Sequence, residues 1–246
     1  MSNRHYSKAP IIEAVIDIQV TMPSAFVFAD LSDLADILKD KFPIRNKIES
    51  FQLQLDADIG DGKSAKTSSM HEEIGIRLGD NANTRVLQLK KIGFTYSHLH
   101  PYTDWDRFSN EAKKYWELFI QHYKPEKVTR CAVRYINRID IPKAPIEIKE
   151  YLNIYPQTPN SISQTITGMH MQLQMPQDDI GSMAIINEAI IEPVITNGIS
   201  VVVDIDVFKN LAIVPINAWD TLEQLRNRKN ALFEEFITDK TRELIQ

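Results

Sequence analysis

A strand pattern that appears twice constrains the fold of this chain more than any other feature. Residues 11–20 and residues 131–141 are both mostly apolar and rich in β-branched side chains, and each lies near the start of one half of the sequence. Each is followed by a candidate helix, several alternating strands and a long helix. The sequence therefore predicts a duplicated α+β fold with halves 1–124 and 125–246, in the order β-α-β-β-β-β-α and then β-α-β-β-β-α.

The boundary between these halves contains no flexible linker. Pro125 ends the long helix of the first half, and the next strand begins at residue 127. We therefore expect one compact unit over residues 1–246, with a mostly antiparallel sheet and helices on one face. The predicted strands are 11–20, 51–55, 72–78, 84–91, 93–99, 127–141, 164–175, 180–192 and 198–207, and the predicted helices are 24–41 (capped by Ser24), 104–123, 145–153 and 218–243.

Composition restricts the class of protein. The 28 basic and 33 acidic residues give a net charge of −5, which argues against binding nucleic acid over the whole surface but allows a local basic patch. The single cysteine, Cys131, excludes an intramolecular disulfide and fits a reducing compartment. No apolar stretch approaches the roughly 18 residues that span a bilayer, and the first ten residues lack the apolar core of a secretory signal. We expect a cytoplasmic protein without a membrane span, and the sequence indicates no cofactor.

Several motifs spread over the chain resemble those of a known family. They are APIIEAVIDI at 9–18, FTYS at 94–97 with the following Pro101, Tyr102 and Trp105, RYINRI at 134–139, DIDVF at 204–208 and FITD at 236–239. Together they resemble a sporadically distributed family of uncharacterised prokaryotic proteins of about this length, for which no activity is established. The resemblance implies one complete unit with this order of elements. Each half is also similar to the half-repeat of the TATA-binding-protein fold, a likeness that implies no function.

Three arginines form the strongest candidate ligand site. Arg130, Arg134 and Arg138 are spaced by four in a predicted strand, which places them on one face and roughly 13 Å apart. Because a guanidinium pairs bidentately with carboxylate or phosphate, the row can hold an anionic ligand. The structural alternative is an acid-base ladder across the sheet with carboxylates of neighbouring strands, namely Glu13, Asp17, Asp204 and Asp206.

Aromatic side chains extend this candidate site. Most aromatic residues of 104–123 follow the helical period and are expected in the core. Tyr96 and Tyr102 fall outside that period, so we expect them near the arginines, where they would stack on a base or another planar ligand. Tyr135 and Asn137 alternate with the arginines and are expected to pack internally on the opposite face.

Other motifs carry weaker indications of chemistry. Asp204 and Asp206 share a strand face and would bind Mg²⁺ only with further ligands. Residues 57–64 (ADIGDGKS) satisfy a relaxed phosphate-loop pattern, but the flanking segments favour a solvated hairpin loop. His98 and His100 make half of a zinc site at an expected exposed strand end. Cys131, inside an apolar strand, is expected to be buried rather than nucleophilic.

Three functions follow from these patterns. Since no catalytic motif is complete, the first is a non-enzymatic binding or regulatory module with a protein partner, as in an accessory or defence-type multi-protein system. The second is a nucleic-acid- or nucleotide-binding protein that uses Arg130, Arg134 and Arg138 with Tyr96 and Tyr102. The third is a metal-dependent phosphoesterase that uses Asp204 and Asp206.

Overall fold

A single antiparallel sheet dominates the computed structural model. The structure describes residues 4–56, 66–142, 144–157, 159, 161, 166 and 168–246, and the side chains of these except 52–56 and 66–70. The strands are β1 (Ile11–Thr21), β2 (Ile44–Asp56), β3 (Lys66–Gly79), β4 (Arg85–Lys90), β5 (Gly93–Leu99), β6 (Lys127–Ile141), β7 (His170–Gln177), β8 (Ser182–Ile191) and β9 (Ile199–Ile213). The helices are α1 (Leu31–Ile37), α2 (Trp105–Tyr123), α3 (Ala218–Phe236) and α4 (Asp239–Ile245), with short 3-10 turns at Phe28–Asp30, Ile148–Glu150, Asp178–Ile180 and Pro215–Asn217.

The nine strands form one sheet in the order β2-β3-β4-β5-β1-β6-β9-β8-β7. All the pairs are antiparallel, and β1 pairs with β6 at the centre, with Val15 opposite Arg134. This confirms the predicted α+β fold with a large antiparallel sheet. None of the helices in the described part of the chain is long and apolar enough to cross a membrane.

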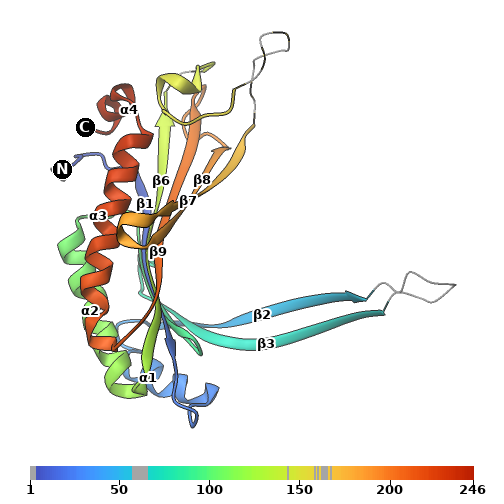
Figure 1. Ribbon diagram of the computed structural model, residues 1–246, viewed down its shortest axis with the longest axis vertical. Helices are drawn as coiled ribbons and strands as arrows, with labels where there is room; N and C mark the ends of the chain where they lie inside the picture. Colours follow the sequence, from blue (N-terminus) through green and yellow to red (C-terminus); the bar gives the residue numbers. More distant parts are fainter. Residues whose placement is uncertain are drawn as a thin grey trace.

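The helices cover one face of this sheet, as predicted (Figure 1). Alternation in each strand turns its apolar side chains toward them: in β1, Ala14, Ile16 and Ile18 are fully buried. On α2, Trp116 and Phe119 stack on each other and meet Phe94 of β5 edge to face. Each such large side chain contributes roughly 1.5–3 kcal/mol through burial, so this layer stabilises the fold strongly.

The opposite face of the sheet is curved and carries polar side chains. In Figure 1 the β2–β3 hairpin projects away from the helices, and the sheet bends around the open face. Glycine permits the tight contact between the central strands: a Cβ on Gly93, whose φ is +155°, would lie 2.1 Å from the carbonyl oxygen of Ile18. In the same pairing of β1 with β5, Asp17 and Thr95 lie opposite each other on the open face.

Several predicted boundaries are wrong. Strand β3 begins at Lys66 rather than 72, and β9 ends at Ile213 rather than 207. The predicted helix 24–41 shrinks to α1, because residues 23–30 first turn and Asp30 accepts a hydrogen bond from the backbone N–H of Val27 (2.9 Å), so Ser24 caps no helix. The predicted helix 218–243 breaks at Ile237, which is extended and bridges to Leu152. The segment 145–153 contains only a 3-10 turn, and β2 begins at Ile44 rather than 51.

Candidate functional site

A network of ion pairs crosses five strands on the open face. Its centre is Asp17 of β1, whose carboxylate accepts hydrogen bonds from Lys90 Nζ (2.8 Å), Thr95 Oγ1 (2.6 Å) and Arg130 Nη1 (3.0 Å). Arg130 also donates to Asp206 of β9 (3.1 Å) and lies over the Phe208 ring, 4.4 Å from its centroid. These side chains are only 17–20 % exposed, so the charges are held in place by one another.

A second part of this network centres on Asp204. Arg134 donates from Nε and Nη2 to the two carboxylate oxygens at 2.7 and 2.6 Å, and Asn187 of β8 donates to the same carboxylate at 3.1 Å. The Asp204 side chain is 7 % exposed, whereas that of Arg134 is 45 % exposed. This fork-like pair raises the pKa of Arg134, so the guanidinium stays charged on the floor of the open face.

The third arginine pairs locally. Arg138 donates from Nε to Asp140 on its own strand (3.1 Å), and Asp140 also accepts a hydrogen bond from Ser200 of β9 (2.6 Å). Arg130, Arg134 and Arg138 thus lie on one face of β6, and every one of them has a carboxylate partner. Arg130 and Arg134 form the predicted acid-base ladder across the sheet with Asp17, Asp204 and Asp206. Arg138 pairs on its own strand instead, and Glu13 faces the same hollow without an ion pair among the described residues.

A shallow hollow of about 330 Å³ lies over this network between β4 and β9. Its lining includes Gln88, Lys90, Arg130, Arg134 and Asp206. Burial raises the pKa of Asp206, and its buried Oδ1 has no hydrogen-bond partner among the described residues. The hollow therefore offers the exposed edge of Arg134 to a bound molecule, whereas Asp206 Oδ1 is closed off from solvent.

The structure does not place Tyr96 and Tyr102 with the arginines, so the predicted stacking site is wrong in its aromatic part. Tyr96 is fully buried on the helix-covered face and stacks on Phe108. The Tyr102 hydroxyl lies 2.8 Å from that of Tyr135, on the same covered side. Tyr135 and Asn137 pack internally as expected; the Asn137 side chain donates to the carbonyl of Val203 (3.0 Å).

The weaker sequence motifs are also located. Asp204 and Asp206 share the open face but are already held by Arg134 and Arg130. Among the described residues, no group of three or more histidine, cysteine or carboxylate side chains is placed to hold a metal ion. Residues 57–64 lie outside the described part of the chain.

His98 and Cys131, two further candidate residues, are both buried. His98 is buried against Phe108 rather than exposed, which corrects the expected strand end, and burial lowers its pKa. Cys131 is buried as expected, and burial raises the pKa of its thiol to about 12, so it is a poor nucleophile at neutral pH.

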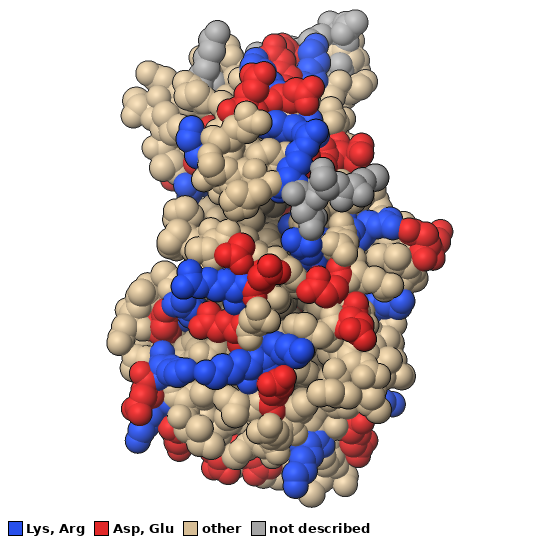
Figure 2. All heavy atoms as spheres, turned by 90° about the vertical axis from the view of Figure 1, so that its left-hand side faces the viewer, with Lys and Arg blue, Asp and Glu red and all other residues tan. Residues whose placement is uncertain are grey.

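A larger cavity, which no sequence motif indicates, lies on the helix-covered side. It measures about 890 Å³ and is bounded by the N-terminal segment, the start of α2, strand β6 and α3. Figure 2 shows this side of the molecule, hollowed near its middle, with acidic and basic side chains interspersed. Lys229 of α3 lines the cavity and is 6 % exposed. One feature of the sequence indicates this cavity: Lys229 is a charged residue in the apolar stripe of α3, between Leu225 and Phe233.

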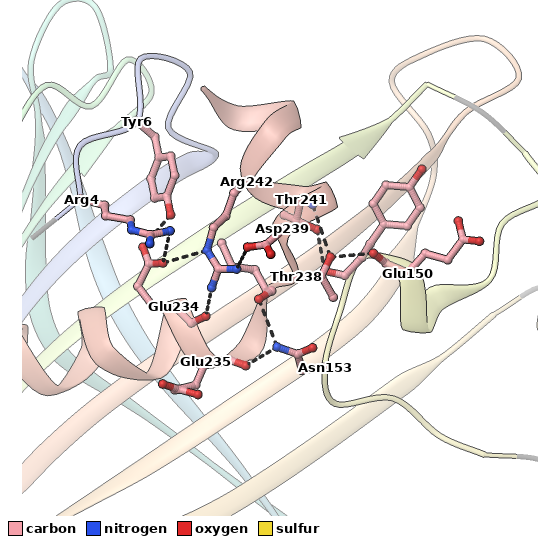
Figure 3. A network of polar contacts seen from close by, with 12 residues as sticks. Arg4, Tyr6, Glu150, Asn153, Glu234, Glu235, Thr238, Asp239, Thr241 and Arg242 are labelled. Atoms are coloured by element: carbon pink, nitrogen blue, oxygen red, sulfur yellow. Dashed lines mark hydrogen bonds and ion pairs between the residues drawn. The ribbon is translucent and has the colours of Figure 1, made fainter. Parts of the chain in front are cut away.

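A polar clamp fixes one wall of this cavity (Figure 3). Glu234 near the end of α3 accepts hydrogen bonds from the Tyr6 hydroxyl (2.7 Å) and from Arg242 Nε (3.1 Å). Arg242 of α4 also donates to Asp239 (2.7 Å). The N-terminal segment, α3 and α4 are therefore tied to one carboxylate, and the wall formed by Tyr6 is held in place.

Comparison with known proteins adds no assignment. No protein-family model matches the chain, and no curated protein matches it.

Proposed function

We propose that this protein is a non-enzymatic binding module that receives a protein partner on the open face of its sheet. One observation carries the proposal: the floor of that face is a network of paired charges, from Lys90 on β4 to Asp206 on β9, and none of the helices that the structure describes covers it. Such a floor presents donors and acceptors of both signs at fixed positions. A polypeptide, which also carries both, complements it better than a uniform polyanion.

The two alternative functions have less support. A nucleic-acid site needs cations free to replace counter-ions, whereas Arg130, Arg134 and Arg138 are each neutralised by an aspartate. A metal-dependent phosphoesterase needs carboxylates that are free to bind a metal ion, whereas Asp204 and Asp206 each form an ion pair with an arginine. Both alternatives stay predictions that require the network to open.

We also propose that the two halves are an internal repeat of the kind seen in the TATA-binding-protein fold. Outward from the centre, one half runs β1, β5, β4, β3, β2, and the other runs β6, β9, β8, β7. In each half the first strand pairs with the last. Superposing residues 11–123 on residues 127–236 should therefore align β1 with β6 and β5 with β9; any other alignment would contradict the repeat.

Site-specific photo-crosslinking in the protein's own host cells tests the binding proposal. A photoreactive residue at Gln88, in the hollow, should yield a discrete adduct with another protein, and the same residue at exposed Lys113 on α2 should not. Adding Arg134→Glu, which reverses a charge on the floor, should remove the Gln88 adduct. Adducts formed equally at both positions, at Lys113 alone or at neither would overturn the proposal.

A further inference from the structure

The cavity on the helix-covered side contains the features of a small-molecule site. Aromatic side chains from four different segments of the chain meet in its wall, and polar and charged side chains converge on the same space. The side chains that matter are those of Tyr6, Tyr102, Trp105, Tyr135, Phe233 and Lys229. Its volume of about 890 Å³ accommodates a molecule of drug-like size.

Lys229 is the unusual member of this set. Its ammonium nitrogen lies 3.6 Å from the centroid of the Tyr135 ring, a cation–π contact. Among the described residues, no carboxylate lies within 4.0 Å of that nitrogen. A lysine side chain that is 94 % buried without a counter-ion is costly, because the ring replaces only part of the lost hydration.

The surrounding charges do not supply the missing partner. Arg226, one turn earlier on α3, disfavours the charged form of Lys229, and Glu234 favours it but pairs with Arg242. The charged and titratable groups that line the cavity around Lys229 are Arg226, Arg228, Glu234 and Glu235 of α3, Arg4, His5 and Tyr6 of the N-terminal segment, Tyr102, Asp104 and Asp106 at the start of α2, and Tyr135 of β6.

We propose that this cavity binds a small organic carboxylate with an apolar or aromatic body, whose carboxylate pairs with the Lys229 ammonium. The aromatic lining would bury the body, and Trp105 and Tyr102 would lie beside it. The bound anion supplies the counter-ion that the protein lacks and so converts a destabilising buried charge into a binding contact. This site is separate from the open face and stands without the proposed protein partner.

Binding at this site is linked to protonation. Burial lowers the pKa of Lys229 to about 7, and a carboxylate beside the ammonium raises it again. Binding should therefore take up a proton above neutral pH, and the affinity should fall by about tenfold for each pH unit above 7 until the pKa of the complex is reached.

Titration of the whole chain with 4-phenylbutyrate and decanoate, each beside its neutral amide, tests the proposal. Tryptophan fluorescence and calorimetry at about pH 6 and about pH 8, in buffers of different ionisation enthalpy, report affinity and proton uptake. We expect each carboxylate to bind at least tenfold more tightly than its amide, with proton uptake at the higher pH. Lys229→Met should remove this preference, and Lys113→Met, on the exposed face of α2, should keep it.

Several outcomes would overturn the inference. They are amides that bind as well as the carboxylates, affinities that do not change with pH, or no binding of either series up to millimolar concentration. Should Lys229→Met fail to fold, as shown by circular dichroism, the amide comparison and the proton count on the unmodified chain still decide the question.

Discussion

Arg134 of β6 does not pair with the residue directly opposite it: it reaches diagonally to Asp204 of β9, although Asp206 is its register partner. Asp206 is left for Arg130, which reaches along Phe208 to meet it. Both side chains therefore reach along the sheet in the same direction, each to an aspartate beyond its register partner. Removing either arginine leaves a buried acid without a main partner.

The first prediction concerns this pair. Arg134→Ala should lower the free energy of unfolding by about 2–3 kcal/mol, because the nearly buried Asp204 loses two charge-assisted hydrogen bonds. Asp204→Asn combined with Arg134→Ala should cost clearly less than the sum of the two single changes. Urea denaturation of the four proteins measures this coupling. Arg45→Ala, which removes the exposed pair with Asp36, is the control and should cost less than about 1 kcal/mol.

The second prediction concerns Glu188 on the covered face of β8. Its side chain is fully buried, neither carboxylate oxygen has a partner among the described residues, and burial raises its pKa from 4.5 to about 7. Because the pKa of this acid is higher in the folded chain than in the unfolded chain, ionising it lowers the free energy of unfolding. This loss of stability is absent below pH 4.5, grows between pH 4.5 and 7, and is complete above pH 7.

Glu188→Gln should therefore raise the free energy of unfolding by up to about 3 kcal/mol at pH 8 and leave it unchanged near pH 4. Thermal denaturation across this pH range measures the difference. Glu192→Gln, at an exposed position just after the same strand, should show no such pH dependence. Equal effects of the two changes would mean that Glu188 is solvated or paired in solution.

The third prediction concerns the stability cost of Lys229. Its pKa is lowered from 10.5 to about 7, so the unfolded chain binds more protons between these values and stability rises with pH over that window. Lys229→Met should raise the melting temperature most at pH 7 and below, and the gain should shrink toward pH 10. Lys113→Met provides the baseline. A gain that stays constant with pH would indicate a packing effect rather than a buried charge.

The fourth prediction concerns the attachment of α4. Thr238 caps this helix and also donates to the carbonyl of Glu150 (2.6 Å), and Arg242 ties it to Glu234 (3.1 Å). Thr238→Ala should cost about 1 kcal/mol, and Arg242→Met should accelerate hydrogen exchange throughout α4. Lys240→Ala, which removes a solvent-exposed ion pair with Glu150, should leave that exchange unchanged. Slow exchange in the Arg242 variant would show that the hydrogen bond from Thr241 to the carbonyl of Tyr151 (2.5 Å), rather than the clamp, retains the helix.

Local pattern was sufficient to predict most elements of the fold. Strict alternation gave β5 its observed bounds, Gly93–Leu99, and the helical period gave α2 to within one residue. The same alternation predicts the face on which Tyr96 lies. Phe94 and Tyr96 are two residues apart and share the covered face, while Thr95 and Ser97 share the open face. The prediction that Tyr96 lies near the arginines was wrong because its position in the strand, and not its aromatic ring, determines the face on which it lies.

What could not be predicted depends on pairings between distant segments. The even spacing of the arginines placed them on one face, but their choice of partner depends on the register of β1, β6 and β9, which one sequence does not specify. The cavity is harder still, because Tyr6, Tyr102, Tyr135 and Lys229 come from four separate segments. Only Lys229, as a charge in an apolar stripe, stood out along the chain.

The central position of β1 also affects how the chain folds during its synthesis. β1 is made before the other described strands, and both of its neighbours are made much later: β5 begins at Gly93 and β6 ends at Ile141. At ribosomal speeds of about 5–20 residues per second, both edges of β1 wait on the order of ten seconds for their partners. Through that interval an apolar strand with two unsatisfied edges is exposed beside the ribosome, so the nascent chain should be a ready client for a chaperone that shields such segments.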